Sequence, residues 1–266
     1  MRLRVASFNI HHGVGLDGKL DLDRIAEVVR STGAEVVGLQ EVDRHLSVRS
    51  GWIDQPGWLA EHLGMHVAYG ANIDLDPDHR RGPGAPRRHY GNAVLSTRPI
   101  EAWQNIRLPG RDGAEPRGLL TARISVDGAD GGRTEVVVAC THLQNRSPAE
   151  RLVQAARVVE VLMPPGVVEP TVLLGDMNAE PDTPEVRTLT ATFTDAWAVA
   201  GGGARVGPGG ATSRSTGGDA DLTFDAATPH ARIDYVLTTP PLQPHAAWVI
   251  PTDASDHRPV VADLAS

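Results

Sequence analysis

The opening of the chain constrains the fold most, because it alternates a strand, a helix and a second strand. Residues 2–10 place apolar side chains at alternate positions, which is typical of a strand. Asp21 is a suitable N-cap for the amphipathic stretch that follows it, and Gly33 is a suitable stop for a helix. Residues 36–39 form a short apolar run, as a buried strand does. This order favours a layered α/β architecture.

Later segments continue the alternation. Further strands are predicted at residues 66–70, 92–96, 119–126, 134–139, 171–174, 233–237 and 260–261. Helices are predicted from residue 56 to residue 63, after the capping box at Ser147, and after Thr183. The inward face of the helix after Ser147 is assigned to Leu152, Ala156, Val159 and Met163. Because no internal repeat occurs, we predict a single domain over residues 1–266.

Two stretches break this pattern. Residues 74–89 are polar, interrupted by proline and glycine, and rich in arginine, and we interpret them as a long surface loop. The arginines of this loop either are simply solvated or form a rim that contacts an anion. Residues 201–218 are rich in glycine and are predicted to be the most flexible part of the chain.

Composition excludes several classes of protein. The single Cys140 excludes an internal disulfide and a cysteine-based zinc site. No apolar run approaches the roughly 18 residues of a membrane span. The N-terminus lacks the pattern of a signal peptide, which favours a cytoplasmic protein. The net charge of −8 disfavours a non-specific DNA binder, because such proteins usually have a basic face.

Polar side chains of the kind that chemistry uses follow the predicted strands. They are Asn9, Glu41, His142, Asp176, Asn178, Asp234, Asp256 and His257. Each has an ordinary structural explanation, and an aspartate followed two residues later by an asparagine is usually a turn. Strand ends gather at one edge of a layered α/β fold and form its site, so the joint occurrence of these residues indicates an active site.

These residue types suit the hydrolysis of a phosphate ester. Carboxylate and amide oxygens are hard ligands that favour Mg²⁺ or Mn²⁺. A divalent ion of this kind polarises a phosphoryl oxygen and stabilises charge on the leaving oxygen. Histidine suits proton transfer, and Asp234 and Asp256 are both candidates for fixing the tautomer of that histidine.

Short motifs occur in a characteristic order along the chain. They are Ser-Phe-Asn-Ile, Leu-Gln-Glu-Val-Asp, Gly-Asn-Ala-Val-Leu-Ser, Thr-His-Leu, Gly-Asp-Met-Asn, Arg-Ile-Asp-Tyr-Val and Ser-Asp-His-Arg-Pro. In this order they resemble the endonuclease/exonuclease/phosphatase superfamily, which includes deoxyribonuclease-I-like nucleases, inositol polyphosphate 5-phosphatases and bacterial sphingomyelinases. The resemblance runs from Ser7 to Val260. It implies a four-layer α/β sandwich, in which two packed mixed β-sheets are flanked by helices.

The resemblance also implies metal and phosphate ligands among the residues at the strand ends. Asn9 and Glu41 would hold the principal divalent metal, with Asp256 nearby. His142 would lie near the phosphate, as an acid or as a donor to an oxyanion.

The remaining strand-end residues match the family positions that handle water and protons. Asp176 and Asn178 would orient the attacking water and hold a phosphate oxygen. His257 would act as a base or as a phosphate ligand, oriented by Asp234. Whether Asp176 or His257 activates the water stays open, because family members are compatible with both.

Four further residues are predicted to contact the substrate or its phosphate. Arg117 matches a position that often carries an arginine close to the site, and Asn92 belongs to one of the matching motifs. Many nucleases of the group have a loop with fewer polar side chains at the position of His11 and His12. In this respect the loop looks more like that of the small bacterial hydrolases of the superfamily. A polar loop without a ligand role explains these two histidines equally well.

The leading hypothesis is a metal-dependent phosphoesterase that acts on a small molecule or a lipid-type headgroup, by metal-assisted attack of water. The alternative is a nuclease acting on DNA or RNA, with the arginines of residues 80–88 as a clamp on the nucleic-acid backbone. A non-catalytic binding module is disfavoured, because none of the expected positions is substituted. The sequence leaves open whether a monoester or a diester is cleaved, which metal is used, and the oligomeric state.

Overall fold

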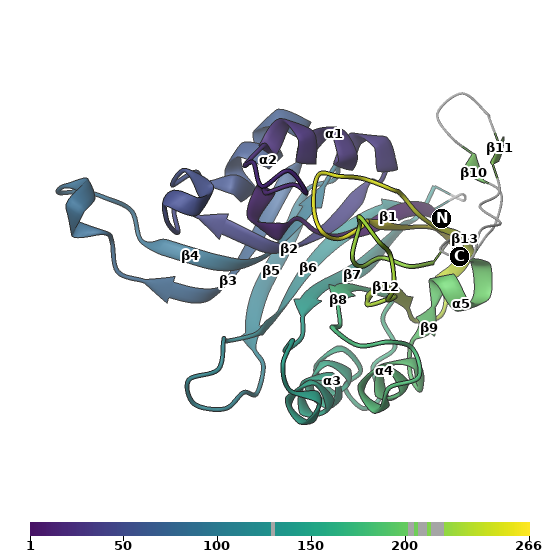
Figure 1. Ribbon diagram of the computed structural model, residues 1–266. Coiled ribbons are helices and arrows are strands. Elements are labelled where there is room, and N and C mark those ends of the chain that lie inside the picture. Colours follow the sequence, from purple (N-terminus) through teal and green to yellow (C-terminus); the bar gives the residue numbers. More distant parts are fainter. Residues whose placement is uncertain (129–130, 202–204, 207–211, 214–220) are drawn as a thin grey trace.

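The computed structural model describes residues 1–128, 131–201, 205–206, 212–213 and 221–266. Within these residues, two six-stranded mixed sheets pack face to face, and helices cover their outer faces (Figure 1). The first sheet contains β1 (Arg2–Asn9), β2 (Val36–Arg44), β3 (His66–Leu75), β4 (Arg88–Ser96), β13 (Gln243–Val249) and β14 (Val260–Ala265). Its strand order is β13-β14-β1-β2-β4-β3.

The second sheet has the order β5-β6-β7-β8-β12-β9. Its strands are β5 (Ile100–Arg107), β6 (Gly118–Asp127), β7 (Arg133–His142), β8 (Thr171–Asp176), β9 (Thr194–Asp195) and β12 (Asp234–Thr238). The α-helices are α1 (Leu22–Thr32), α2 (Gln55–Leu63), α3 (Pro148–Leu162), α4 (Pro184–Thr190) and α5 (Ala196–Ala200). The short strands β10 (Arg205–Val206) and β11 (Thr212–Ser213) pair separately. The predicted four-layer α/β sandwich is therefore confirmed.

Each sheet is built around one parallel strand pair joined by a helix. β1 and β2 run parallel with α1 between them, and β7 and β8 run parallel with α3 between them. The predicted limits of α1 are confirmed: the Asp21 side chain accepts a hydrogen bond from the Arg24 amide, and Gly33 adopts the left-handed conformation after the last turn. The carboxyl ends of both pairs meet at one edge of the sandwich, which places their terminal side chains together.

Three apolar cores separate the four layers. The core between the sheets includes Val36, Val94, Val138, Leu174 and Val236. A second core, between the first sheet and helices α1 and α2, includes Ile25, Val29, Leu39 and Leu59. A third core, between the second sheet and helices α3 and α4, includes Val158, Leu162, Leu173 and Leu189. Neighbouring residues of one strand serve different cores because successive side chains point to opposite faces.

The two sheets approach each other closely beneath the strand ends. A Cβ atom at Gly38 of β2 would lie 2.8 Å from the Leu174 Cβ and 3.2 Å from the Cys140 Sγ. Only glycine fits at this distance. Its small size lets β2 of the first sheet approach β8 of the second sheet closely. Cys140 itself is fully buried, as a core residue.

The interpretation of residues 74–89 as a loop is wrong at both of its ends. β3 and β4 continue into this stretch as a hairpin arm, in which Asp74 pairs with His89 and Leu75 with Arg88 (Figure 1). The Asp74 carboxylate also contacts the side chains of His89 in the opposite strand, at 2.9 Å, and of Arg87 just before that strand, at 2.7 Å. These cross-strand ion pairs favour strand pairing in a segment whose composition resembles a loop.

The predicted inward face of α3 is wrong for two of its four residues. Val159 and Met163 are partly buried against the third core, but Ala156 is exposed and Leu152 is 40% exposed, whereas Arg151, Gln154, Ala155, Val158 and Leu162 are buried. The face is shifted because two buried polar side chains have partners: Arg151 Nε lies 2.6 Å from Glu185 of α4, and Gln154 Oε1 accepts a hydrogen bond from the Gln144 amide. These contacts fix the loop that follows β7.

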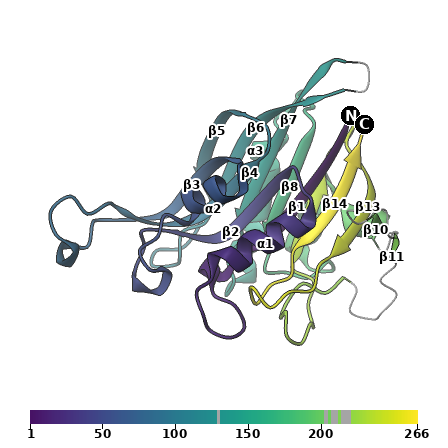
Figure 2. The ribbon, with the colours of Figure 1, turned by 90° about the horizontal axis from the view of Figure 1, so that it is seen from above.

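Figure 2 shows the two sheets from above, with β13 and β14 at one side and the hairpin arm at the other. Most of the glycine-rich stretch 201–218 lies outside the described residues. Within the described residues, no helix is long and apolar enough to cross a membrane. The single domain over residues 1–266 and the cytoplasmic location stay predictions.

Candidate active site

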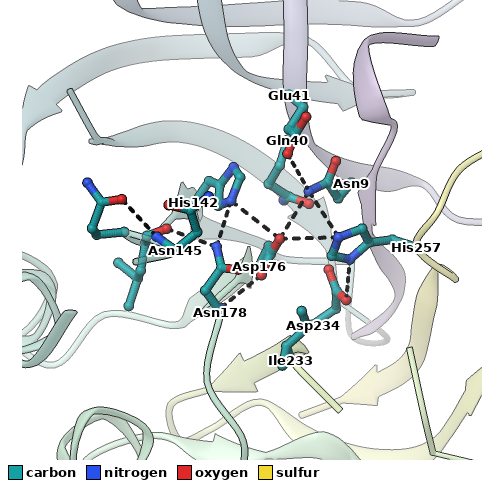
Figure 3. Close-up of polar contacts among 12 residues, drawn as sticks. Asn9, Gln40, Glu41, His142, Asn145, Asp176, Asn178, Ile233, Asp234 and His257 are labelled. Carbon is teal, nitrogen blue, oxygen red and sulfur yellow. Dashed lines mark hydrogen bonds and ion pairs between the residues drawn. The ribbon is translucent and has the colours of Figure 1, made fainter. Parts of the chain in front are cut away.

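The strand ends of both sheets form one hydrogen-bonded cluster. Figure 3 shows seven of the predicted residues directed toward one another: Asn9, Glu41, His142, Asp176, Asn178, Asp234 and His257. The eighth strand-end residue, Asp256, is the neighbour of His257 in the loop before β14. The structure therefore brings together the residues that the sequence pattern placed at one edge.

Asp176, at the end of β8, is the centre of the cluster. Its carboxylate is 1% exposed. Oδ1 accepts a hydrogen bond from the Asn178 amide at 2.8 Å, and Oδ2 accepts one from Asn9 Nδ2 at 3.0 Å. Burial, and then the nearby Asp234 carboxylate, raise the pKa of Asp176 to about 7. A carboxylate tuned in this way exchanges a proton near neutral pH, as a general base must.

His257 links the two acidic residues of the second sheet. Its Nδ1 lies 2.9 Å from Asp234 Oδ2, and its Nε2 lies 3.6 Å from Asp176 Oδ2. Burial lowers the pKa of His257, but Asp234 and Asp176 outweigh burial and raise it to about 10. In the protonated state both ring nitrogens donate, so Nε2 can hold a phosphate oxygen while Asp234 fixes the ring.

His142 and Asn178 form the opposite wall of the cluster. Asn178 Nδ2 lies 2.8 Å from His142 Nε2 and 3.1 Å from the Leu143 carbonyl oxygen. A carbonyl oxygen only accepts, so the Asn178 amide nitrogen faces Leu143 and donates to His142 Nε2 in the tautomer that carries its proton on Nδ1. The same Nε2 also lies 3.4 Å from Asp176 Oδ2. Burial, and then Arg117, lower the pKa of His142 well below its ordinary value, which favours the neutral ring.

The predicted metal ligands lie on the first-sheet side. Asn9 Nδ2 lies 3.3 Å from Glu41 Oε1, at the point where the pairing of β2 with β4 shifts register. Burial raises the pKa of Glu41, and the Asp256 carboxylate raises it further. Asp256 lies at the partly exposed edge of the cluster, with its Oδ1 3.8 Å from His11 Nδ1.

These three residues fit a hard divalent cation. Glu41 and Asp256 offer carboxylate oxygens and Asn9 an amide oxygen, which are the donor types that Mg²⁺ and Mn²⁺ prefer, although the Asn9 oxygen accepts from the His11 amide at 3.0 Å and Nδ2 is the atom that faces Glu41. The raised pKa of Glu41 is the sign expected of a carboxylate that lacks a sufficient positive partner. A second group of possible ligands, Asp176, Asp234 and His257, has ligand atoms within 4.8 Å of one another. The hydrogen bond from His257 Nδ1 to Asp234 occupies two of these residues, so we assign the group to proton handling.

Strained backbone is concentrated around the cluster. Among the described residues, six that are not glycine have positive φ, and four of them are His11, His12, Glu41 and Asn178. Such conformations persist only where the surroundings enforce them, and they gather at functional sites.

The turn His11–Gly13, here called the histidine turn, directly follows Asn9. His12 has φ 45° and ψ 30°, and Gly13 has φ 83°. A side chain at Gly13 would meet Leu22 Cδ2 at 2.8 Å. Gln55 holds the turn from below, because its Nε2 donates to the His12 carbonyl oxygen at 2.7 Å. Burial, and then Arg49, lower the pKa of His12 to about 4, so its ring is neutral at neutral pH.

A cavity of about 280 Å³ opens between the histidine turn and Arg117. We call it the His12 cavity. Its lining includes the predicted residues His11, His12, Glu41 and Arg117. Arg117 is 4% exposed, and its Nη1 lies 2.9 Å from Glu115 Oε1. The structure therefore groups Arg117 and both histidines of the turn beside the candidate metal ligands.

Asn92 is the predicted site residue that lies apart from this grouping. It is 1% exposed, and its Nδ2 donates to the Gly118 carbonyl oxygen of β6 at 3.2 Å. This bond ties the two sheets together. A contact of Asn92 with the phosphate stays a prediction.

Other cavity residues have no signal in the sequence. Arg49, Tyr90 and Asn145 line the cavity beside the predicted residues. Arg49 forms a two-pronged ion pair with the fully buried Asp43, at 2.8 and 2.9 Å. These residues reach the cavity through tertiary packing, and no local motif marks them.

Comparisons with known proteins show the family and the fold of the chain. A family model described as the Endonuclease/Exonuclease/phosphatase family matches residues 6–257. The uncharacterized protein YbhP of Escherichia coli K12 is 35% identical over 184 residues, which are 66% of this chain and 66% of that protein. The match thus spans just under two thirds of the relative.

Solved structures are similar over almost the whole chain. An endonuclease/exonuclease/phosphatase from Beutenbergia cavernae DSM 12333 has 29% identity and a TM-score of 0.73, covering 99% of this chain and 71% of that one. The Bacteroides thetaiotaomicron mannosyl-6-phosphatase Bt3783 has 19% identity and a TM-score of 0.73, covering 99% of this chain and 100% of that one. The second likeness establishes the fold alone.

Proposed function

Because the chain belongs to the endonuclease/exonuclease/phosphatase family, whose members hydrolyse phosphoric ester bonds, we propose that it is a divalent-metal-dependent phosphoesterase for a small phosphate ester. The observation that carries this proposal is the bonded network from Asn9 through Asp176 to His257 and Asp234. Such a network would bring an acid, a base and metal ligands within reach of one phosphate.

The side chains divide the chemistry between them. A divalent ion at Asn9, Glu41 and Asp256 would polarise a phosphoryl oxygen and stabilise charge on the leaving oxygen. Protonated His257 donates from Nε2 to a phosphate oxygen. Asp176 has a pKa of about 7 and can accept a proton from the attacking water.

The second candidate for activating the water is His257 in its neutral form. Its pKa of about 10 disfavours that form at neutral pH, so Asp176 is our choice. The two assignments predict different pH profiles. Activity that rises through a pKa near 7 and is lost above about 10 supports Asp176 as base and His257 as donor.

A small substrate is favoured over a nucleic acid by the state of the arginines in the hairpin arm. Arg80 lies 2.7 Å from Asp78, and Arg87 lies 2.7 Å from Asp74. An aspartate neutralises each of these two cations, which weakens the clamp that a phosphodiester backbone would need, whereas Arg81 stacks on Trp52 and Arg88 donates to the Asp76 carbonyl oxygen. The net charge of −8 acts in the same direction. That a fold neighbour is named a mannosyl-6-phosphatase supports a small ester as well.

Hydrolysis assays test this proposal directly. The chain is assayed on phosphomonoesters, phosphodiesters and plasmid DNA with Mg²⁺, Mn²⁺ or EDTA. We expect turnover of a small ester that EDTA abolishes and metal restores. A protein that hydrolyses no ester with either metal, or that is fully active in EDTA, contradicts the proposal.

The nuclease alternative has its own signature. Efficient nicking of plasmid DNA that falls steeply with added salt, and that Arg80→Ala with Arg87→Ala weakens, would replace the small-ester assignment. Activity on a small ester that is unchanged in this double variant supports it.

A further inference from the structure

We propose that the His12 cavity binds the leaving group of the ester, and that this group is a compact polyhydroxylated unit such as a single sugar or polyol. The inference rests on the proposed function, whose substrate it specifies. It stands on three observations: where the cavity opens, which of its polar groups lack partners, and how its charges are balanced.

One candidate metal ligand, Glu41, lies in the wall of the cavity. Glu41 belongs both to the metal side of the cluster and to the cavity wall. A phosphate bound between Glu41 and Asp176 therefore has the cavity on one side and the His257–Asp234 pair on the other. The group attached through the ester oxygen has to extend away from the buried pair, and the cavity is the space next to Glu41.

The size of the cavity limits what it can hold. Its volume of about 280 Å³ lies just below the ~300–1,000 Å³ that drug-sized ligands occupy. Side chains of both kinds form the wall, including the apolar Leu46 and Ile73 and the polar Tyr90 and Asn145. One ring with polar substituents suits this space, whereas a nucleotide with its base does not.

Two residues that line the cavity carry a polar atom without a hydrogen-bond partner. His12 Nδ1 and Arg117 Nε are both buried and unpaired within the described residues. Buried polar groups in proteins are almost always hydrogen bonded, so a missing partner indicates a ligand or water. Arg117 Nε only donates, and the neutral His12 ring donates from one nitrogen and accepts at the other. Hydroxyl groups satisfy both needs, because each donates and accepts.

The histidine turn holds the His12 ring in place. Gln55 Oε1 accepts from the Asp43 amide at 2.9 Å while its Nε2 donates to the His12 carbonyl oxygen. Gln55 is fully buried, so this bridge is rigid. A residue whose backbone is already held binds a hydroxyl at a smaller cost in conformational freedom.

The charges of the wall disfavour a second phosphate on the leaving group. Arg49 is bound to Asp43 by two hydrogen bonds, and Arg117 is paired with Glu115. Glu41 adds a further negative charge. A second phosphate would therefore have to displace an existing ion pair, whereas neutral hydroxyls leave both pairs intact.

The test compares three esters that share one primary alkyl leaving oxygen. They are a hexose 6-phosphate, cyclohexylmethyl phosphate, which has the ring without hydroxyls, and a hexose 1,6-bisphosphate. If only diesters are cleaved, the methyl diesters of the same three alcohols are used. The variant is His12→Asn, because asparagine tolerates a left-handed backbone. The control is His66→Asn at the exposed start of β3.

We expect the wild type to prefer the hexose 6-phosphate over cyclohexylmethyl phosphate in kcat/KM. His12→Asn should reduce this preference about 10-fold through loss on the hexose ester. The variant should lose much less on the cyclohexylmethyl ester than on the hexose ester, and His66→Asn should match wild type on all three.

Three results would overturn the inference: equal loss on all esters in His12→Asn, no preference for hydroxyls in the wild type, or a preference for the bisphosphate. If no ester is hydrolysed, the proposed function fails, and calorimetric binding of the hexose 6-phosphate then decides the subsite by itself. Binding that His12→Asn weakens supports the subsite, and the absence of binding overturns it.

Discussion

The two parallel strand pairs end at the same edge of the sandwich but place different chemistry there. β1 ends at Asn9, Glu41 lies within β2 where its pairing with β4 shifts register, and the histidine turn and the His12 cavity adjoin them. β7 and β8 end in His142 and Asp176, which lie beneath the loops of the second sheet. We call the β1–β2 side, with the histidine turn and the His12 cavity, the open half of the site. We call the β7–β8 side, with His142 and Asp176, the closed half.

The difference between the halves is one of access to water. Asp176 is 1% exposed, and its pKa is raised by burial to about 7. The Asp256 side chain, on the open side, is 34% exposed. We infer that the closed half sets the positions of protons, because a low dielectric strengthens its charges. The open half selects the metal and the substrate.

The largest effect should come from breaking the closed half. Asp176→Asn keeps the shape of the side chain but removes the charge that faces His257, and we expect kcat to fall ~10³–10⁴-fold. Asp182→Asn is the matched control, because that side chain is 98% exposed. Steady-state kinetics on the best small ester would measure the loss. Near-normal kcat in Asp176→Asn would remove this residue from the proton-handling group.

Breaking the open half should show in the metal dependence. Glu41→Gln retains the hydrogen-bonding length but removes a negative ligand, so we expect ~10²-fold lower activity at low Mg²⁺ and partial recovery at high Mg²⁺. The exposed Glu61→Gln on α2 serves as control. Activity titrated against Mg²⁺ and Mn²⁺ is the measurement. A loss that no metal concentration changes would place Glu41 outside the metal site.

Much of the closed half was predictable from sequence. Its residues directly follow buried strands, so strand pattern and motif order together located Asp176, Asn178 and His142. The α1 limits followed from Asp21 and Gly33 for the same reason, since a cap is a local signal. The family resemblance supplied the roles, which composition alone could not.

The open half was less predictable because tertiary contacts build it. Gln55 supports the His12 backbone across 43 positions of sequence, and nothing near Gln55 indicates that role. β5 was not predicted, because most of its side chains are exposed and do not alternate. The α3 face was misassigned because Arg151 and Gln154 occupy buried positions that a hydrophobic pattern reserves for apolar residues.

A pH series sharpens the comparison through stability. A carboxyl group whose folded-state pKa is raised, as for Asp176, stabilises the fold below its unfolded pKa, and that contribution is lost as pH rises through about 7. Asp176→Asn should therefore gain stability over wild type as pH rises from about 4 to above 7, by on the order of 1 kcal/mol. Thermal unfolding of both proteins in EDTA would measure it. A stability difference between the two proteins that does not change with pH would show that burial does not raise the pKa of Asp176.

The smallest expected effect tests whether the open half binds the substrate without taking part in the chemical step. Gln55→Ala removes the donor to the His12 carbonyl oxygen and the acceptor of the Asp43 amide. Each unpaired buried group costs about 1–3 kcal/mol, so the variant should unfold at lower denaturant concentration. The Gln55 side chain is hydrogen bonded to the backbone of Asp43 and His12, not to Glu41 or Asp176. We therefore expect KM for the preferred ester to rise a few-fold while kcat stays within about 2-fold of wild type. Gln104→Ala, on the exposed face of β5, controls for the loss of a surface amide. A fall in kcat as large as that of Asp176→Asn would mean that the histidine turn takes part in the chemistry, and the division between an open and a closed half would then fail.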